Sequence, residues 1–234
     1  MFTFLLLFAG WEINQIKVGM GYNGNYYEFW QVNWDTVGKY LGNHLWAQPG
    51  EFAVVDISST KRVMFTTDIW WDRILWFEME KNQEGGWYTT KVEDIVYPGG
   101  FYGITYLWKT GGKYYFAATS PFNGEIVIIC YDPSNSNAYI TSSLFVSEAF
   151  PTDITTNHNG RIWVVDEFKE IIRTWHLGNP PDASQAHTYR EYGKPFGGSG
   201  VWEFREPTSV AYWNGNVYVC DAGNKRVVKI GNVY

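Results

Sequence analysis

The sequence predicts an all-β fold built from five diverged copies of one four-stranded motif. Short runs of β-branched and aromatic residues alternate with Asn-Gly and Gly-Gly pairs, and aromatic residues make up 19% of the chain. No stretch keeps the 3.6-residue period of apolar positions that an amphipathic helix needs. Because the motif repeats at the length of one propeller blade, we expect a β-propeller, with residues 1–234 as a single domain.

The clearest copy of the motif lies at residues 205–232. It reads as a strand, an Asn-Gly turn, a second strand that ends in Asp, a polar turn and a third strand. A copy at residues 149–179 matches it Pro for Pro, Asn-Gly for Asn-Gly and Asp for Asp. Three weaker copies, at residues 23–43, 51–77 and 99–133, keep only the hydrophobic skeleton. The residues that we take as equivalent on the third strand are Val37, Ile74, Ile126, Ile171 and Val227.

The last two copies resemble the NHL repeat. In that repeat a Pro precedes the first strand, a Gly lies in the turn, an Asp ends the second strand and Asn-x-Arg-Val follows. The residues that match in the last copy are Pro207, Gly215, Asp221, Asn224, Arg226 and Val227. The copy before it keeps Pro151, Gly160, Asp166 and Ile171, but has Phe-Lys-Glu where Asn and Arg would stand. Most NHL propellers have six blades, so six is the alternative to five.

The last copy supplies only three strands, and we expect residues 2–8 to supply the fourth by pairing with residues 227–230. This closure would remove an exposed sheet edge and would explain why residues 2–8 lack alternating polar positions. The same apolar run has no basic segment before it and is too short to span a bilayer. We therefore interpret it as a strand rather than as a signal peptide or a membrane span.

Charge and cysteine content exclude several classes of function. The formal net charge is −6 and the 18 basic residues are scattered, so no nucleic-acid partner is expected. Cys130 and Cys220 have no Cys or His at metal-ligand spacing and lie in different copies, so we expect two shielded free thiols. The sequence predicts neither a metal nor a cofactor.

The loops between the second and third strands of the copies are expected to share one face of the ring. They lie at residues 31–35, 68–72, 119–125, 166–170 and 221–225, and they are rich in aromatic and charged residues. Function in such folds is commonly carried by loops on a rigid scaffold. The candidate ligand-binding residues are Trp34, Asp35, Trp70, Trp71, Asp72, Phe122, Glu167, Phe168 and Lys225.

Aromatic faces beside carboxylates suit sugar rings and cations, and they equally suit a protein surface. We therefore expect a non-catalytic module that binds a glycan or a protein, or a structural subunit of a larger assembly, in an extracellular or particle-surface setting. The opposing interpretation is that the aromatic residues only fill gaps between blades. For Asp68, Asp166 and Asp221 we expect a structural role, in which each carboxylate accepts backbone N–H groups of the following turn.

The alternative function is a hydrolase or lyase that acts at the mouth of the channel. NHL-like propellers include an amidating lyase, and carboxylates that could act here are Glu12, Glu51, Asp153 and Glu206. The four histidines fall at no repeating second-strand position, which argues against a metal site in the channel. The Gly-rich residues 193–200 are not followed by Lys-Ser or by a helix, so they are interpreted as a flexible connection.

Overall fold

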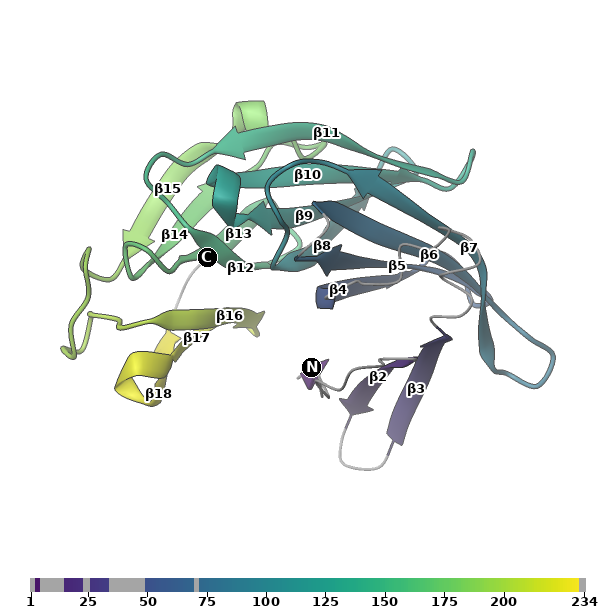
Figure 1. Ribbon diagram of the computed structural model, residues 1–234, viewed down its shortest axis with the longest axis horizontal. Coiled ribbons are helices and arrows are strands. Elements are labelled where there is room, and N and C mark those ends of the chain that lie inside the picture. Colours follow the sequence, from purple (N-terminus) through teal and green to yellow (C-terminus); the bar gives the residue numbers. More distant parts are fainter. Residues whose placement is uncertain (1–2, 5–14, 23–25, 34–48, 70–71, 232–234) are drawn as a thin grey trace.

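The computed structural model describes residues 3–4, 15–22, 26–33, 49–69 and 72–231, with side chains from residue 50 onward apart from residues 188–189. Within this part of the chain, antiparallel strands form five sheets that follow one another in sequence (Figure 1). Among the described residues, no helix has the length and apolar character needed to cross a bilayer.

Three of the sheets have the four strands of a complete propeller blade. They are β4 (Pro49–Asp56), β5 (Lys61–Asp68), β6 (Arg73–Lys81) and β7 (Trp87–Val96); β8 (Ile104–Thr110), β9 (Lys113–Ser120), β10 (Glu125–Asp132) and β11 (Asn137–Phe145); and β12 (Pro151–Thr156), β13 (Arg161–Asp166), β14 (Ile171–His176) and β15 (His187–Tyr192).

The first and last sheets have three described strands each. The first contains β1 (Thr3–Phe4), β2 (Gln15–Tyr22) and β3 (Tyr26–Asn33), and the last contains β16 (Pro207–Trp213), β17 (Asn216–Asp221) and β18 (Arg226–Ile230). The all-β propeller class is thus confirmed, whereas the predicted count of five four-stranded blades is not.

The predicted closure of the ring is wrong for the described part of residues 2–8. Thr3 and Phe4 pair with Met20 and Gly19 of β2, and within the described residues β18 has only β17 beside it. A partner close in sequence costs less chain entropy to reach than one at the far end of the chain, which favours the local pairing.

The predicted third-strand positions are nearly in register. Ile74, Ile126 and Val227 are each the second residue of their strand, whereas Ile171 is the first residue of β14, so its neighbour Ile172 is the true equivalent. Val37 lies outside the described residues.

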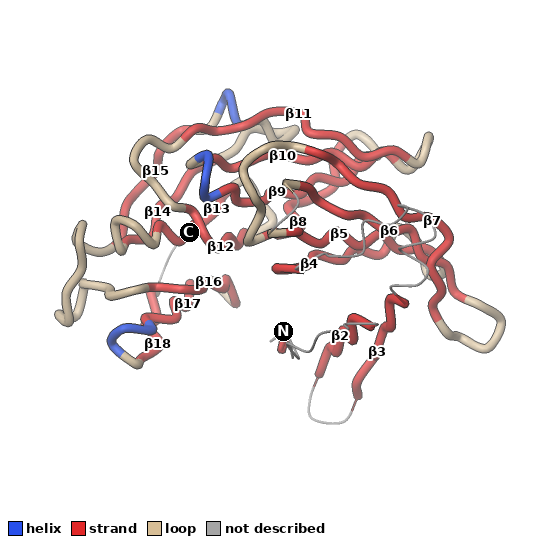
Figure 2. The backbone as a smooth tube through the Cα atoms, in the orientation of Figure 1, coloured by secondary structure: helices blue, strands red, loops and turns tan. Residues whose placement is uncertain are grey.

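The first strand of each sheet lies toward the centre of the arrangement, and the later strands lie progressively farther out (Figures 1 and 2). There β12 lies beside both β8 and β16, and β8 lies beside β4. Gly103, just before β8, permits this close approach, because a Cβ on it would lie 2.8 Å from the Cα atom of Asp153.

The Asn-Gly turn forms as the sequence predicts. Asn214 and Gly215 both have positive φ, as such a turn requires.

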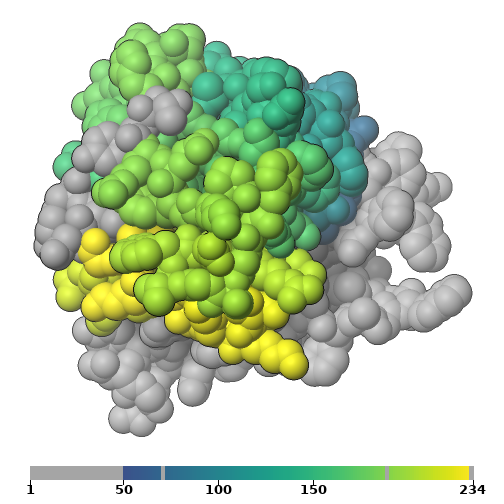
Figure 3. Space-filling view, turned by 90° about the vertical axis from the view of Figure 1, so that its left-hand side faces the viewer, coloured from purple at the N-terminus to yellow at the C-terminus, as the bar shows by residue number. Residues whose placement is uncertain are grey.

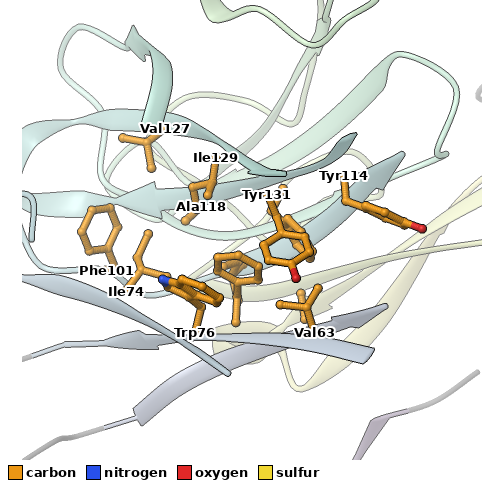
Figure 4. Close-up of a cluster of buried hydrophobic side chains, with 13 residues drawn as sticks. Val63, Ile74, Trp76, Phe101, Tyr114, Ala118, Val127, Ile129 and Tyr131 are labelled. Carbon is orange, nitrogen blue, oxygen red and sulfur yellow. The ribbon is translucent and has the colours of Figure 1, made fainter. Parts of the chain in front are cut away.

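Apolar side chains fill the space between neighbouring sheets. Between the sheets β4–β7 and β8–β11, the ring centroids of Phe65 and Phe116 lie 4.3 Å apart. The rings of Trp76 and Tyr131 meet edge to face at 5.7 Å (Figure 4). Inner strands such as β9 and β13 are buried on both faces, whereas the outermost strand β11 alternates between exposed and half-buried positions. Similar clusters join β8–β11 to β12–β15 and β12–β15 to β16–β18.

The aspartate that ends the second strand forms an ion pair in three of the sheets, and for Asp166 the predicted hydrogen bond from the following turn is present as well. Asp68, Asp166 and Asp221 bind the guanidinium groups of Arg73, Arg173 and Arg226 at 3.0, 2.8 and 2.7 Å. Asp166 also accepts hydrogen bonds from the backbone N–H groups of Lys169 in the next turn and of Phe150 before β12. The carboxylate therefore ties its own turn to the segment that leads into the same sheet.

The NHL-like residues of the last sheet form one such network. Asn224 donates to the Asp221 carboxylate, while the guanidinium group of Arg226 donates to the carbonyl oxygens of Gly200 and Glu203 at 2.7 and 2.6 Å. These bonds hold the connection between β15 and β16 against the last sheet. In Figure 3 the yellow-green atoms of this connection lie next to the yellow atoms of β17 and β18.

The two cysteines are free, as expected, but only one of them is shielded. Cys130 is buried between two sheets, whereas Cys220 is exposed. Val217 and Val219 turn toward the neighbouring sheet, and no described sheet covers the face of β17 that carries Cys220. The expectation of shielding was therefore wrong for Cys220.

Replacing Asp68 by alanine is expected to lower the free energy of unfolding by about 3 kcal/mol or more, because Arg73 would stay buried without its closest carboxylate. Chemical denaturation measures the change. The matched control is Glu93→Ala, which breaks the exposed pair with Lys91 and should cost less than about 1 kcal/mol. Equal costs for the two variants would contradict the structural role of the aspartate.

Candidate functional site

The structure brings together some of the predicted site residues. Phe122 lies in η1 (Pro121–Asn123) between β9 and β10, and Glu167 and Phe168 lie between β13 and β14. All three line one open groove with a volume of about 910 Å³. We call it the phenylalanine groove. Its lining residues are Pro121, Phe122, Asn123, Gly124, Phe145, Val146, Glu148, Ala149, Phe150, Glu167, Phe168, Glu170 and Phe196.

Two other predicted site residues lie outside the groove lining. Asp72 accepts hydrogen bonds from the backbone N–H groups of Gly99 and Gly100 at 3.2 and 2.7 Å, so its carboxylate holds the connection into β8. Lys225 is exposed and has a left-handed backbone at the end of η3 (Ala222–Asn224). The remaining candidates, Trp34, Asp35, Trp70 and Trp71, lie outside the described residues, so their part in binding stays a prediction.

Four of the five phenylalanines of the groove are exposed, Phe150 is half-buried, and most of their rings contact one another. Phe122 and Phe168 are 65% and 60% exposed, so neither is a plug between blades. The ring of Phe122 meets that of Phe150 edge to face at 5.7 Å, and Phe168 meets Phe196 in the same way at 6.2 Å. Tyr102 packs edge to face on both Phe122 and Phe150. These contacts restrict the rings before any partner binds.

Backbone hydrogen bonds join the walls of the groove. The N–H of Glu167 donates to the carbonyl oxygen of Phe150 at 3.1 Å, and the N–H of Phe196 donates to that of Lys169 at 2.9 Å. Three separate connections are thereby fixed together, because Phe150 precedes β12, Lys169 follows β13 and Phe196 follows β15. A site of this kind is largely formed in advance, which reduces the entropy lost on binding.

The described lining of the groove is negatively charged. Its described lining contains three glutamates and neither lysine nor arginine. Lys169, outside the lining, donates to the Glu148 carboxylate at 3.0 Å, and this hydrogen bond lowers the pKa of Glu148. The Glu170 carboxylate accepts the backbone N–H of Glu206 at 3.0 Å. Partial burial raises the pKa of Glu167, and the nearby charge of Glu206 raises it further.

Three of the five groove phenylalanines, Phe145, Phe150 and Phe196, are absent from the candidate residues that the sequence predicts. Phe145 is the last residue of β11, and its exposure reflects the alternation of an outermost strand. Phe196 lies in the Gly-rich segment that we had interpreted only as a flexible connection. The usable signal was an aromatic residue among glycines, since a connection without a role rarely needs one.

A second feature lies on the innermost strands. Glu51 of β4 and Asp153 of β12 share a side-chain hydrogen bond, although their sheets are not neighbours. Glu51 also accepts the backbone N–H of Ile104 on β8, and Asp153 accepts that of Val210 on β16 at 2.7 Å. Four successive sheets are thus linked by one pair of carboxyl groups.

Burial alters the acidity of both carboxyl groups of this pair. Burial, followed by the charge of Asp153, raises the pKa of Glu51 well above its ordinary value. Burial also raises the pKa of Asp153, although hydrogen bonds from backbone N–H groups oppose that change. Glu51 is therefore the member of the pair that binds a proton more readily. Of the other carboxylates proposed for the channel, Glu206 lies beside Glu167 and Glu170, and Glu12 lies outside the described residues.

The described residues hold no group of three or more His, Cys, Asp or Glu side chains that could bind a metal ion. Catalysis by the Glu51 and Asp153 pair would require free oxygen atoms at the channel. Both Asp153 oxygens instead accept backbone N–H groups, from Ile154 and from Val210. The pair is accordingly better suited to fixing the strands than to proton transfer with a substrate.

Residues 204–230 match the NHL repeat family, in agreement with the resemblance of the last copy. Among solved structures, the chain is similar to virginiamycin B lyase from Staphylococcus aureus, with 12% identity and a TM-score of 0.52 over 92% of this chain and 58% of that one. It is also similar to a luciferin-regenerating enzyme, with 13% identity and a TM-score of 0.55 over 99% and 78% of the two chains.

A third similar structure is that of a nidogen/laminin complex, with 14% identity and a TM-score of 0.54 over 93% of this chain and 68% of that one. A sequence search among curated proteins finds no match. The chain spans less than two thirds of the length of the lyase. At these identities the likeness concerns the propeller fold, which serves both enzymes and binding proteins.

The Glu51 and Asp153 pair predicts a pH dependence of stability. In the unfolded chain the pKa of Glu51 is about 4.3. In the folded protein this pKa is raised. At pH values between the two pKa values, the folded state therefore binds more protons than the unfolded state. Stability should therefore fall as the pH rises through this window, by up to about 1.4 kcal/mol per pH unit. Glu51→Gln, which cannot ionise, should remove this slope.

Denaturation of the wild type and of Glu51→Gln at several pH values checks this expectation. The control is Glu84→Gln, which removes an exposed carboxylate from the turn between β6 and β7 and should keep the wild-type slope. Parallel curves for the wild type and Glu51→Gln would show that no shared proton stabilises the fold.

The exposure of the groove rings predicts that they contribute little to stability. Phe122→Ala and Phe168→Ala should each cost less than about 1 kcal/mol, whereas Phe116→Ala, in the buried cluster, should cost about 3 to 5 kcal/mol. Thermal unfolding of the three variants measures this. A large loss for the groove variants would support the opposing interpretation, that these aromatics serve packing.

Proposed function

We propose that this protein is a non-catalytic recognition module that binds a protein partner through the phenylalanine groove. The observation that supports it is the exposure of Phe122 and Phe168 on adjoining loops whose backbones are already fixed. Monomeric proteins rarely expose large aromatic side chains together unless the patch is used for binding. Aromatic side chains are also enriched at the centres of protein interfaces.

A protein partner fits the groove better than a glycan does. Sugar recognition needs fixed donors as well as acceptors beside the aromatic faces. The described lining offers carboxylates as acceptors, but its only amide side chain, Asn123, already donates to the carbonyl oxygen of Pro98. The five phenylalanine side chains offer no hydrogen-bonding group, so they favour contact with apolar side chains of a polypeptide segment. A glycan ligand stays the alternative within the recognition proposal.

The proposal includes five blades, arranged around a common centre, as the rigid support. Its basis is that five sheets succeed one another along the chain and that the three four-stranded ones repeat the same inner-to-outer strand order. A hydrolase or lyase at the channel mouth is the second candidate, and the buried pair of Glu51 and Asp153, both with a raised pKa, is the observation that favours it. Both oxygens of Asp153 already accept backbone N–H groups, which makes it the weaker candidate.

Selection of random peptides displayed on phage, using the whole chain as bait, tests the proposal. Peptides that bind the wild type should lose affinity by about 30-fold or more with Phe168→Ala, as expected for an interface anchor worth about 2 kcal/mol. Tyr88→Ala is the matched control, because Tyr88 is an exposed aromatic residue at the opposite end of a sheet.

A glycan array measured in parallel tests the alternative ligand. The proposal fails if Phe168→Ala and Tyr88→Ala have equal effects on the selected peptides. It also fails if glycans bind in a way that depends on Phe168 while peptides do not bind.

A further inference from the structure

The charges around the phenylalanine groove are unevenly balanced. The charge of Glu148 is balanced, because its carboxylate forms an ion pair with Lys169. Glu170 is occupied by the backbone N–H of Glu206. In the described part of the chain, no lysine or arginine forms an ion pair with Glu167 or Glu206, and the two carboxylates repel one another.

Glu167 belongs to the aromatic wall of the groove, and Glu206 lies next to that wall. Glu167 is adjacent in sequence to Phe168, whose ring contacts Phe196, and all three line the groove. The backbone N–H of Glu206 binds Glu170, which lines the same wall. A cation that entered here would meet carboxylates on one side and phenylalanine rings on the other. Carboxylates attract a positive charge, and so does the face of an aromatic ring.

We propose that the groove selects a protein segment in which a lysine or arginine is flanked by apolar side chains, with the basic group beside Glu167 and Glu206 and the apolar groups on the phenylalanines. This inference rests on the proposed function and narrows its partner. Binding of the cation relieves the repulsion between the two carboxylates, so the gain comes from charge complementarity as well as from contact area. A neutral or acidic segment obtains only the apolar contacts.

Three matched libraries of seven-residue peptides test the inference. Each has randomised Leu, Ile, Phe and Met at six positions, and the central residue is Lys or Arg in the first library, Gln in the second and Glu in the third. Binding to the whole chain is measured at low and at high salt. The basic library should bind at least about tenfold more tightly than the Gln library at low salt, and the difference should shrink at high salt.

Variants assign the preference to the two carboxylates. The double variant Glu167→Gln/Glu206→Gln should bind the basic and Gln libraries equally, while Glu84→Gln, which removes an exposed carboxylate at the opposite end of a sheet, should keep the wild-type preference. Thermal unfolding confirms that the double variant is folded. Phe168→Ala should weaken binding of all three libraries.

The outcomes separate the two proposals. If no library binds, or if Phe168→Ala changes nothing, the proposed function itself is wrong. If the libraries bind through Phe168 but show no preference for the basic centre, the groove is a binding site and the inferred partner chemistry is wrong. If the preference survives in the double variant, the placement of the basic group beside Glu167 and Glu206 is wrong.

Discussion

The arrangement of this propeller depends on an acidic side chain at the end of a second strand. Asp166 binds an arginine of the next strand and two backbone N–H groups, one from its own turn and one from the segment before β12. Because a buried carboxylate needs several donors, it draws separate pieces of chain to one point. The two pieces that Asp166 holds are those that carry Phe150 and Phe168. The groove therefore results from the same hydrogen bonds by which Asp166 fixes the sheet.

Much of the fold could be predicted from the sequence, because turns and strand ends are local features. The Asn-Gly pair at residues 214–215 and Asp166 at the end of its second strand act as expected, and the hydrophobic skeleton placed Ile74 and Ile126 correctly. Ring closure failed because it concerns a partner more than 200 residues away, and nothing local in residues 2–8 distinguishes β2 from β18.

The site could be predicted only in part, for a related reason. The repeat pattern identified the loops with Phe122 and Phe168, whereas Phe145 and Phe196 come from an outer strand and from a connection between sheets, which the pattern does not cover. The pairing of Glu51 with Asp153 could not be predicted from the sequence either. It joins sheets that are not neighbours, and it requires Gly103 to let β12 come close to the segment before β8.

The way in which Arg226 holds the last connection affects how this protein can diverge. Its guanidinium group binds the carbonyl oxygens of Ser199, Gly200 and Glu203, and carbonyl groups are present whatever the side chains are. Substitutions at the exposed tip, at Val201 and Trp202, can therefore accumulate without releasing the anchor. The same holds for Phe196, which is fixed through its backbone N–H. One wall of the groove is in this sense open to natural variation, and descendants of this chain could exchange partners while they keep the scaffold.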